Sequence, residues 1–165
     1  MSTRFSALPF TLRRSTDVIA GPEITTTDET IHGVLRLAGD QLVVQARLTR
    51  SVSRVGRTIK TDTESEPVIE CAIPLGSLAS ATVKRSWWRR AVRLSLVAAD
   101  LRAFEALQSG LKLGHPAELV VSVSRADYDA AVEFASELEL AIAEQALTAL
   151  EGRDDQPLKR LSEES

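Results

Sequence analysis

Alternating apolar and polar residues mark the first clear secondary structure in the chain. Apolar side chains recur at alternate positions in residues 31–37 and again in residues 42–48, which is the spacing of half-buried β-strands. The residues between them, 38–41, include Gly39 and Asp40, which is typical of a tight turn. The two segments therefore predict a β-hairpin.

Short apolar runs predict four further strands, over residues 68–73, 79–83, 91–97 and 118–123. Residues 74–78 predict a corner between the first two of these strands. Two other stretches lack a clean period. The polar segment 49–66 is expected to end a strand and continue as a mobile loop, and residues 101–107 are compatible with either a strand or a helical turn.

The C-terminal third carries the period of an amphipathic helix. Ser124 can cap its start, with Asp127 as the partner in a capping box, and Gly152 is a natural stop. One predicted face consists of Ala131, Val132, Ala135, Leu138, Ile142, Ala146 and Ala149, and the opposite face of Glu133, Glu137, Glu144 and Glu151.

Six to seven strands followed by one long helix predict a mainly β fold with α. We expect a bent antiparallel sheet, or partly open barrel, whose apolar open end is closed by the C-terminal helix. Residues 29–152 are expected to form this domain. Residues 1–28 are expected to be a partly ordered N-terminal extension, and residues 153–165 a disordered tail.

Three passages carry a resemblance to a known family. They are IPLGSLASATV, WRRAVRLSLV and ELVVSVSRADYDAAVEFASELELAI. Over about residues 30–150 the chain resembles the bacterial members of the pleckstrin-homology-like (PH-like) superfamily and the related GRAM-type modules. The resemblance implies the bent sheet with its closing helix. Lipid-binding members hold inositol phosphates with basic residues around the first hairpin loop, but residues 38–41 carry no positive charge here.

Composition restricts the core and the compartment. The chain is 44% hydrophobic but has only seven aromatic residues among 165, so the core is expected to be aliphatic. A single cysteine, Cys71, excludes an intramolecular disulfide. The N-terminus lacks the apolar run of a secretory signal, and no window reaches the roughly 18–20 apolar residues of a membrane span. We expect a cytoplasmic, bacterial-type protein without an integral membrane segment.

Residue types that commonly serve in catalysis do not occur in a recognisable pattern in this chain. His32 and His115 lack the paired spacing of metal ligands, and Cys71 lies in an apolar strand. Neither a GxGxxG nor a GxxxxGK[ST] phosphate loop is present. The sequence therefore predicts no catalytic residues, no metal site and no cofactor.

The segment KRSWWRRAVR is the main candidate for a binding site. It contains five basic residues and both tryptophans of the chain. The candidate partner-binding residues are Lys84, Arg85, Trp87, Trp88, Arg89 and Arg90. The alternative is that both rings cover the end of the sheet while the arginines remain in water, stacked on them. Adjacent strand residues point to opposite sides, so at most one ring is expected to be free for a partner. A second basic run can share a surface with the first if their strands are neighbours; it consists of Arg47, Arg50, Arg54, Arg57 and Lys60.

Charge is divided unevenly along the chain. Residues 1–60 carry nine basic and five acidic side chains, whereas residues 118–165 carry four and twelve. In the helix, Leu140, Ala143 and Leu147 form a narrow apolar strip beside the acidic face, which is a candidate for self-association.

The sequence predicts a non-catalytic binding or assembly module of the PH-like type that makes protein–protein contacts, including contacts with itself. One alternative is a peripheral membrane domain that binds anionic lipid headgroups through the basic, tryptophan-containing segment. Another is a small enzyme or ligand carrier that uses the open end of the barrel. Nucleic acid binding is disfavoured by the net charge of −3 and by the absence of aromatics within the second basic run.

Overall fold

The structure is a computed structural model that describes residues 7–88, 91–111 and 113–154. Its fold is mainly β with one long C-terminal helix, as the sequence predicts. The strands are β1 (Ala7–Ala20), β2 (Glu23–Ala38), β3 (Gln41–Val55), β4 (Ile59–Ser65), β5 (Ile69–Pro74), β6 (Leu78–Ser86), β7 (Ala91–Ala98) and β8 (Glu118–Val123). The helices are α1 (Glu105–Leu111) and α2 (Tyr128–Asp154), with short 3₁₀ turns at Leu75–Ser77 and Arg125–Asp127.

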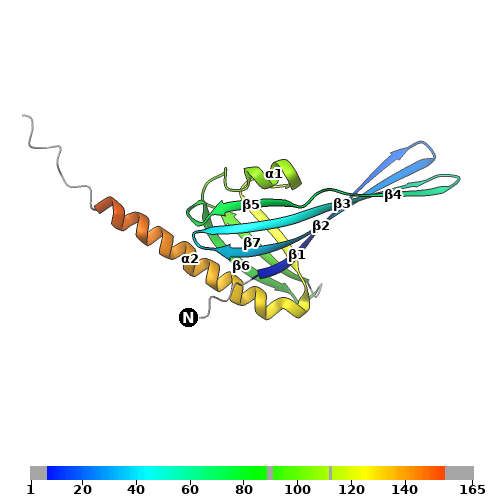
Figure 1. The fold of residues 1–165 in the computed structure, drawn as a ribbon. Helices are drawn as coiled ribbons and strands as arrows, with labels where there is room; N and C mark the ends of the chain where they lie inside the picture. Colours follow the sequence, from blue (N-terminus) through cyan, green and yellow to red (C-terminus); the bar gives the residue numbers. More distant parts are fainter. Residues whose placement is uncertain (1–6, 89–90, 112, 155–165) are drawn as a thin grey trace, which may run out of the picture.

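The eight strands form one antiparallel sheet, in which seven follow the order β4-β3-β2-β1-β8-β7-β6 and β5 pairs with β3. Strand β3 is shared between two partners, because its residues 41–46 pair with β5 and its residues 49–55 pair with β4. The ladders of the described residues do not join β6 back to β4 or β5, so the sheet is bent but not closed. Figure 1 shows α2 crossing one side of the bent sheet and α1 lying beside β5 on another.

Glycine-containing two-residue turns set the register of the two N-terminal hairpins. Ala38 pairs with Gln41 across Gly39 and Asp40, which confirms the predicted hairpin. Ala20 pairs with Glu23 across Gly21 and Pro22. Gly39 and Gly21 have φ angles of 62° and 61°, a left-handed conformation that costs other residues steric energy.

A single hydrophobic cluster, mainly aliphatic but with three phenylalanines, lies on the inner face of the sheet. The strands supply Leu8, Phe10, Ile31, Leu35, Leu42, Val44, Ile73, Leu94, Leu96 and Val121, among others. Helix α2 closes this cluster with Ala131, Phe134, Ala135 and Leu138, and the α1 region adds Phe104, Leu107 and Leu111. Phe134 lies outside the predicted apolar face, whereas Val132, which was placed on it, is 40% exposed.

The edge strand β6 is covered by α2. The backbone N–H of Ala81 donates a hydrogen bond of 2.5 Å to Glu139 Oε1 on the helix. Ser124 precedes α2 as predicted, and its hydroxyl accepts from the N–H of Ala126 at 3.3 Å. These polar contacts seat the first half of the helix across the sheet.

Two long hairpins extend beyond the core as a four-stranded arm, which we define as residues 13–30 and 49–65. Eight residues of β-strand span about 26 Å, which is the distance that the arm extends beyond the core. Residues 7–28, expected as an extension, therefore contribute β1 and the start of β2. The expectation of a mobile loop within residues 49–66 is wrong, because this segment forms the end of β3 and all of β4. Both faces of the arm meet solvent, so its strands lack the alternating apolar pattern of a half-buried sheet.

The remaining differences concern helix boundaries. The ambiguous segment 101–107 leads into α1, which continues to Leu111. Gly152 does not end α2, which the structure follows to Asp154. Residues 155–165 of the expected disordered tail lie outside the described part of the chain.

Gly33 is the glycine whose replacement should cost the most stability. It faces Phe10 across the β1–β2 ladder, and a Cβ here would lie 2.6 Å from the carbonyl oxygen of Gln45. Gly33→Ala should lower the free energy of unfolding by about 1–3 kcal/mol, as overpacking does in a tight core. Urea denaturation followed by circular dichroism measures this loss.

Gly76→Ala is the matched control, because no atom lies within 4 Å of the Cβ it would add. Its unfolding midpoint should remain near that of the wild type. Equal effects of the two substitutions would contradict the close packing of Phe10 against Gly33.

Candidate functional site

The turn between β6 and β7 exposes both tryptophans of the chain. Ser86 pairs with Ala91, so Trp87 and Trp88 stand in the turn beyond the last strand pair. Trp87 is 83% exposed and Trp88 is 78% exposed. Their ring centroids lie 5.4 Å apart with an interplanar angle of 75°, an edge-to-face contact. The interpretation that the rings cover the sheet end is therefore wrong, as is the expectation that at most one ring is free.

Basic side chains stand at the base of this turn. Lys84 and Arg85 are exposed. The guanidinium of Arg85 lies over the ring of Tyr128, 5.3 Å from its centroid, which ties the turn to the start of α2. We call Lys84, Arg85, Trp87 and Trp88 the Trp tip. Arg89 and Arg90, the other two predicted site residues, lie outside the described residues.

The second basic run does not join the Trp tip. Strands β3 and β6 are separated in the sheet by β2, β1, β8 and β7. The run is also divided within itself: Arg47 lies opposite His32, on the other face of β3 from Arg50 and Arg54. The idea of one surface shared by the two basic runs is therefore wrong.

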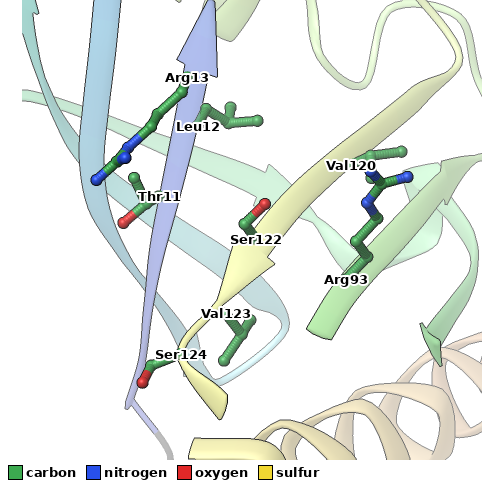
Figure 2. A pocket seen from close by; sticks show the side chains of 8 residues that line it. All are labelled: Thr11, Leu12, Arg13, Arg93, Val120, Ser122, Val123 and Ser124. Atoms are coloured by element: carbon green, nitrogen blue, oxygen red, sulfur yellow. The ribbon is translucent and has the colours of Figure 1, made fainter. Parts of the chain in front are cut away.

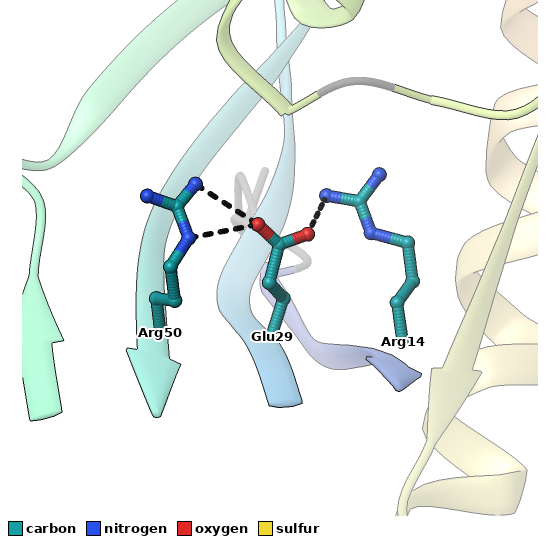
Figure 3. Close-up of polar contacts among 3 residues, drawn as sticks. All are labelled: Arg14, Glu29 and Arg50. Atoms are coloured by element: carbon teal, nitrogen blue, oxygen red, sulfur yellow. Dashed lines mark hydrogen bonds and ion pairs between the residues drawn. The ribbon is translucent and has the colours of Figure 1, made fainter. Parts of the chain in front are cut away.

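Arg50 takes part in an ion-pair bridge at the base of the arm. Figure 3 shows Glu29 between Arg50 and Arg14, which lie on neighbouring strands in one register row. Arg50 donates from Nε at 3.1 Å and from Nη2 at 2.9 Å to Glu29 Oε1, and Arg14 Nη2 lies 2.9 Å from Oε2. Hydrogen bonding and the charge of Glu29 raise the pKa of Arg50. The bridge follows Leu12, Ile31 and Leu48 on the same face of the sheet, where the apolar core ends.

A cleft opens where β1 and β8 diverge. These strands pair only at Thr11 and Ser122, and a cavity of about 550 Å³ lies at the junction. Figure 2 shows Arg13 and Arg93 on either side of Ser122. Two guanidinium groups and nearby hydroxyls can attract an anion. The described lining contains no carboxylate, imidazole or thiol that would activate a nucleophile.

The histidines and the cysteine lie apart from one another. Among the described residues, no group of three or more His, Cys, Asp or Glu side chains could hold a metal ion. His32 and His115 are exposed. Cys71 is partly buried in β5, and this burial raises the pKa of its thiol. A thiol with a raised pKa holds less of the nucleophilic thiolate at neutral pH.

The second half of α2 carries the predicted self-association residues. Leu140 is 61% exposed, Leu147 is 59% exposed, and Ala143 is also exposed. Leu150, which lies outside the predicted strip, continues it at 58% exposure. The four positions follow intervals of three, four and three residues, the spacing of a coiled-coil seam. We call Leu140, Ala143, Leu147 and Leu150 the α2 seam, and Figure 1 shows this part of the helix extending past the sheet.

Comparisons of the chain with models of protein families, with curated proteins and with solved structures found no match. Within the described residues, no helix is long and apolar enough to cross a membrane. The candidate site therefore rests on the geometry of the chain itself.

Tryptophan fluorescence should report directly on the Trp tip, because the chain has no other tryptophan. Since both rings are already in water, unfolding in urea should shift the emission maximum very little. Acrylamide should quench the folded and unfolded proteins to a similar degree. A large red shift on unfolding would show that the rings are buried in the folded protein.

Removing the central carboxylate of the ion-pair bridge should destabilise the protein. Glu29→Gln leaves Arg14 and Arg50 facing each other without the intervening negative charge. The thermal midpoint should fall by about 2–4 °C. Arg54→Gln is the control, because Arg54 lies farther out on the same face of β3 and is exposed. Equal midpoints for the two variants would contradict a stabilising bridge.

Proposed function

We propose that this protein is a non-catalytic binding and assembly module of the PH-like type that makes protein–protein contacts through the Trp tip. The exposure of Trp87 and Trp88 as a contacting pair carries the proposal. Large apolar rings in water are costly for an isolated molecule, and tryptophan and arginine are enriched among residues that dominate binding energy.

The position of the Trp tip also supports a contact role. The last ladder pair, Ser86 with Ala91, fixes where the turn leaves the sheet. The stacking of Arg85 on Tyr128 restrains its base against α2. A side chain held in place before binding loses less conformational entropy when a partner arrives. The rings are therefore displayed on a supported turn that contributes little to the core.

A peripheral membrane domain is the second candidate function. Lys84 and Arg85 stand beside the two exposed indole rings. Indole rings favour the headgroup layer of a bilayer, and neighbouring cations are attracted to anionic lipid. The short acidic turn at Gly39 and Asp40 lacks the basic residues of the phosphoinositide signature. The favoured ligand on this alternative is thus an anionic surface in general.

The protein-binding proposal can be tested by in-cell crosslinking. A photoreactive amino acid at Trp88 should give a discrete adduct with a partner protein, and the same group at Leu101, which is 68% exposed, should not. Excess wild-type chain should compete the adduct away, whereas Trp87→Ala/Trp88→Ala should not compete. This double variant should keep its free energy of unfolding within about 0.5 kcal/mol of the wild type, as expected for exposed sites. Identical adducts at Trp88 and Leu101 would contradict a specific contact.

Vesicles test the membrane alternative. If it holds, vesicles containing phosphatidylserine should shift tryptophan emission to the blue, phosphatidylcholine vesicles should not, and high salt should reverse the shift. Lys84→Gln/Arg85→Gln should weaken this binding. Unchanged emission with both lipids at low salt would eliminate the membrane alternative and leave the protein-binding proposal in place.

A further inference from the structure

The α2 seam is an apolar surface with an acidic border. Helix α2 contains seven acidic residues and one basic residue, Arg153. At 100° per residue, Glu144 and Glu151 lie along one side of the seam, and both are exposed. Antiparallel pairing of this seam with a second copy of itself would bring the two acidic borders together, which costs energy. The seam therefore fits a partner that is apolar in the middle and basic at the edge.

The Trp tip has the complementary chemistry. Trp87 and Trp88 provide the apolar contact, and Lys84 and Arg85 provide exposed positive charge. The two ring centroids are 5.4 Å apart, which equals the pitch of an α-helix at about 5.4 Å per turn. One ring can therefore lie over the small side chain of Ala143 while the other contacts Leu147, about one turn farther along.

These two surfaces of one molecule cannot meet each other. The Trp tip lies at the start of α2, because Arg85 stacks on Tyr128. The seam begins 12 residues farther along at Leu140 and ends 22 residues along at Leu150, about 18 and 33 Å down the helix axis. The C-terminal half of α2 also points away from the sheet that carries the tip (Figure 1). A contact between the two surfaces must therefore join two copies.

We propose that the protein self-assembles head to tail, with the Trp tip of one copy bound to the α2 seam of the next. This inference rests on the proposed binding role of the Trp tip and names its partner as a second copy of the chain. The contact is heterologous: each copy uses one surface to bind and offers the other. Such contacts continue into open chains, or close into rings where the rotation between copies permits.

The exposed surface is sufficient for a modest interface. A tryptophan side chain can bury roughly 150–250 Å², so the pair supplies about half of the roughly 800 Å² that each partner contributes to a standard interface. The three leucines of the seam, each at least 58% exposed, form the receiving surface. Lys84 and Arg85 leave β6 on opposite faces, and their positive charge at the base of the turn attracts the border of Glu144 and Glu151; salt weakens that attraction.

Two variants that each destroy one surface test the arrangement. Trp87→Ser/Trp88→Ser removes the tip, and Leu140→Ser/Leu147→Ser removes most of the seam. In sedimentation velocity the wild type should increase in mass with concentration, while each variant alone should remain monomeric. Loss of the aromatic anchors should weaken association by about tenfold or more. Mixing the two variants should restore association but stop at a one-to-one dimer, because only one intact tip and one intact seam remain.

Ile19→Ser/Ile59→Ser is the matched control. Both isoleucines are 74% exposed in the arm, so it removes similar apolar surface elsewhere and should leave association unchanged. Charge reversal gives a second test. Lys84→Glu/Arg85→Glu should abolish association, and mixing this variant with Glu144→Lys/Glu151→Lys should restore it.

The possible failures have different meanings. If the tip variant alone assembles like the wild type, the seam pairs with itself and the head-to-tail proposal is overturned. If the wild type is monomeric at every concentration, the proposal is also overturned. A crosslink from Trp88 to a different protein, with the wild type monomeric, would sustain the binding role of the tip while rejecting self-assembly.

Discussion

An antiparallel sheet that bends without closing must cover its apolar inner face, and the rest of the structure depends on how it does so. Helix α2 lays Phe134 and Leu138 into that face, and Glu139 binds the backbone of the edge strand β6. Burial of these side chains holds the first half of the helix in place. From Ala143 onward the helix is largely exposed and extends past the sheet. One packing requirement thus produces both a closed core and a free helical surface.

The arm follows from the same limit of the core. The apolar rows end at Leu12, Ile31 and Leu48, and in the next row Glu29 and its two arginines replace apolar packing with ion pairs. Past that row, the strands are held by backbone ladders and by hydroxyl contacts such as Thr26 with Asp17. An ordered sheet can therefore continue where burial has stopped, because its hydrogen bonds are satisfied between its own strands.

The two exposed surfaces of the domain carry opposite charge. The Trp tip carries positive charge at one end of α2, and the seam lies beside glutamates toward the other. Neither surface is part of the core, since the rings and the leucines are exposed. Selection for stability alone would favour polar residues at these positions. Their placement is consistent with the proposed role in contacts between molecules.

Periodicity in the sequence determined the elements that bury one face. The hairpin at 38–41, the strand at Val92, Leu94 and Leu96, and the long C-terminal helix were all predictable, because burial selects apolar residues at fixed intervals. The Trp tip and the α2 seam were recognisable as segments from composition. The arm was not predictable from the sequence, because strands that are solvated on both faces show no regular apolar interval. Only the tertiary structure decided that both tryptophans leave the sheet and that the seam lies beyond it. Exposure depends on where neighbouring elements end, and those positions arise from contacts between residues far apart in the chain.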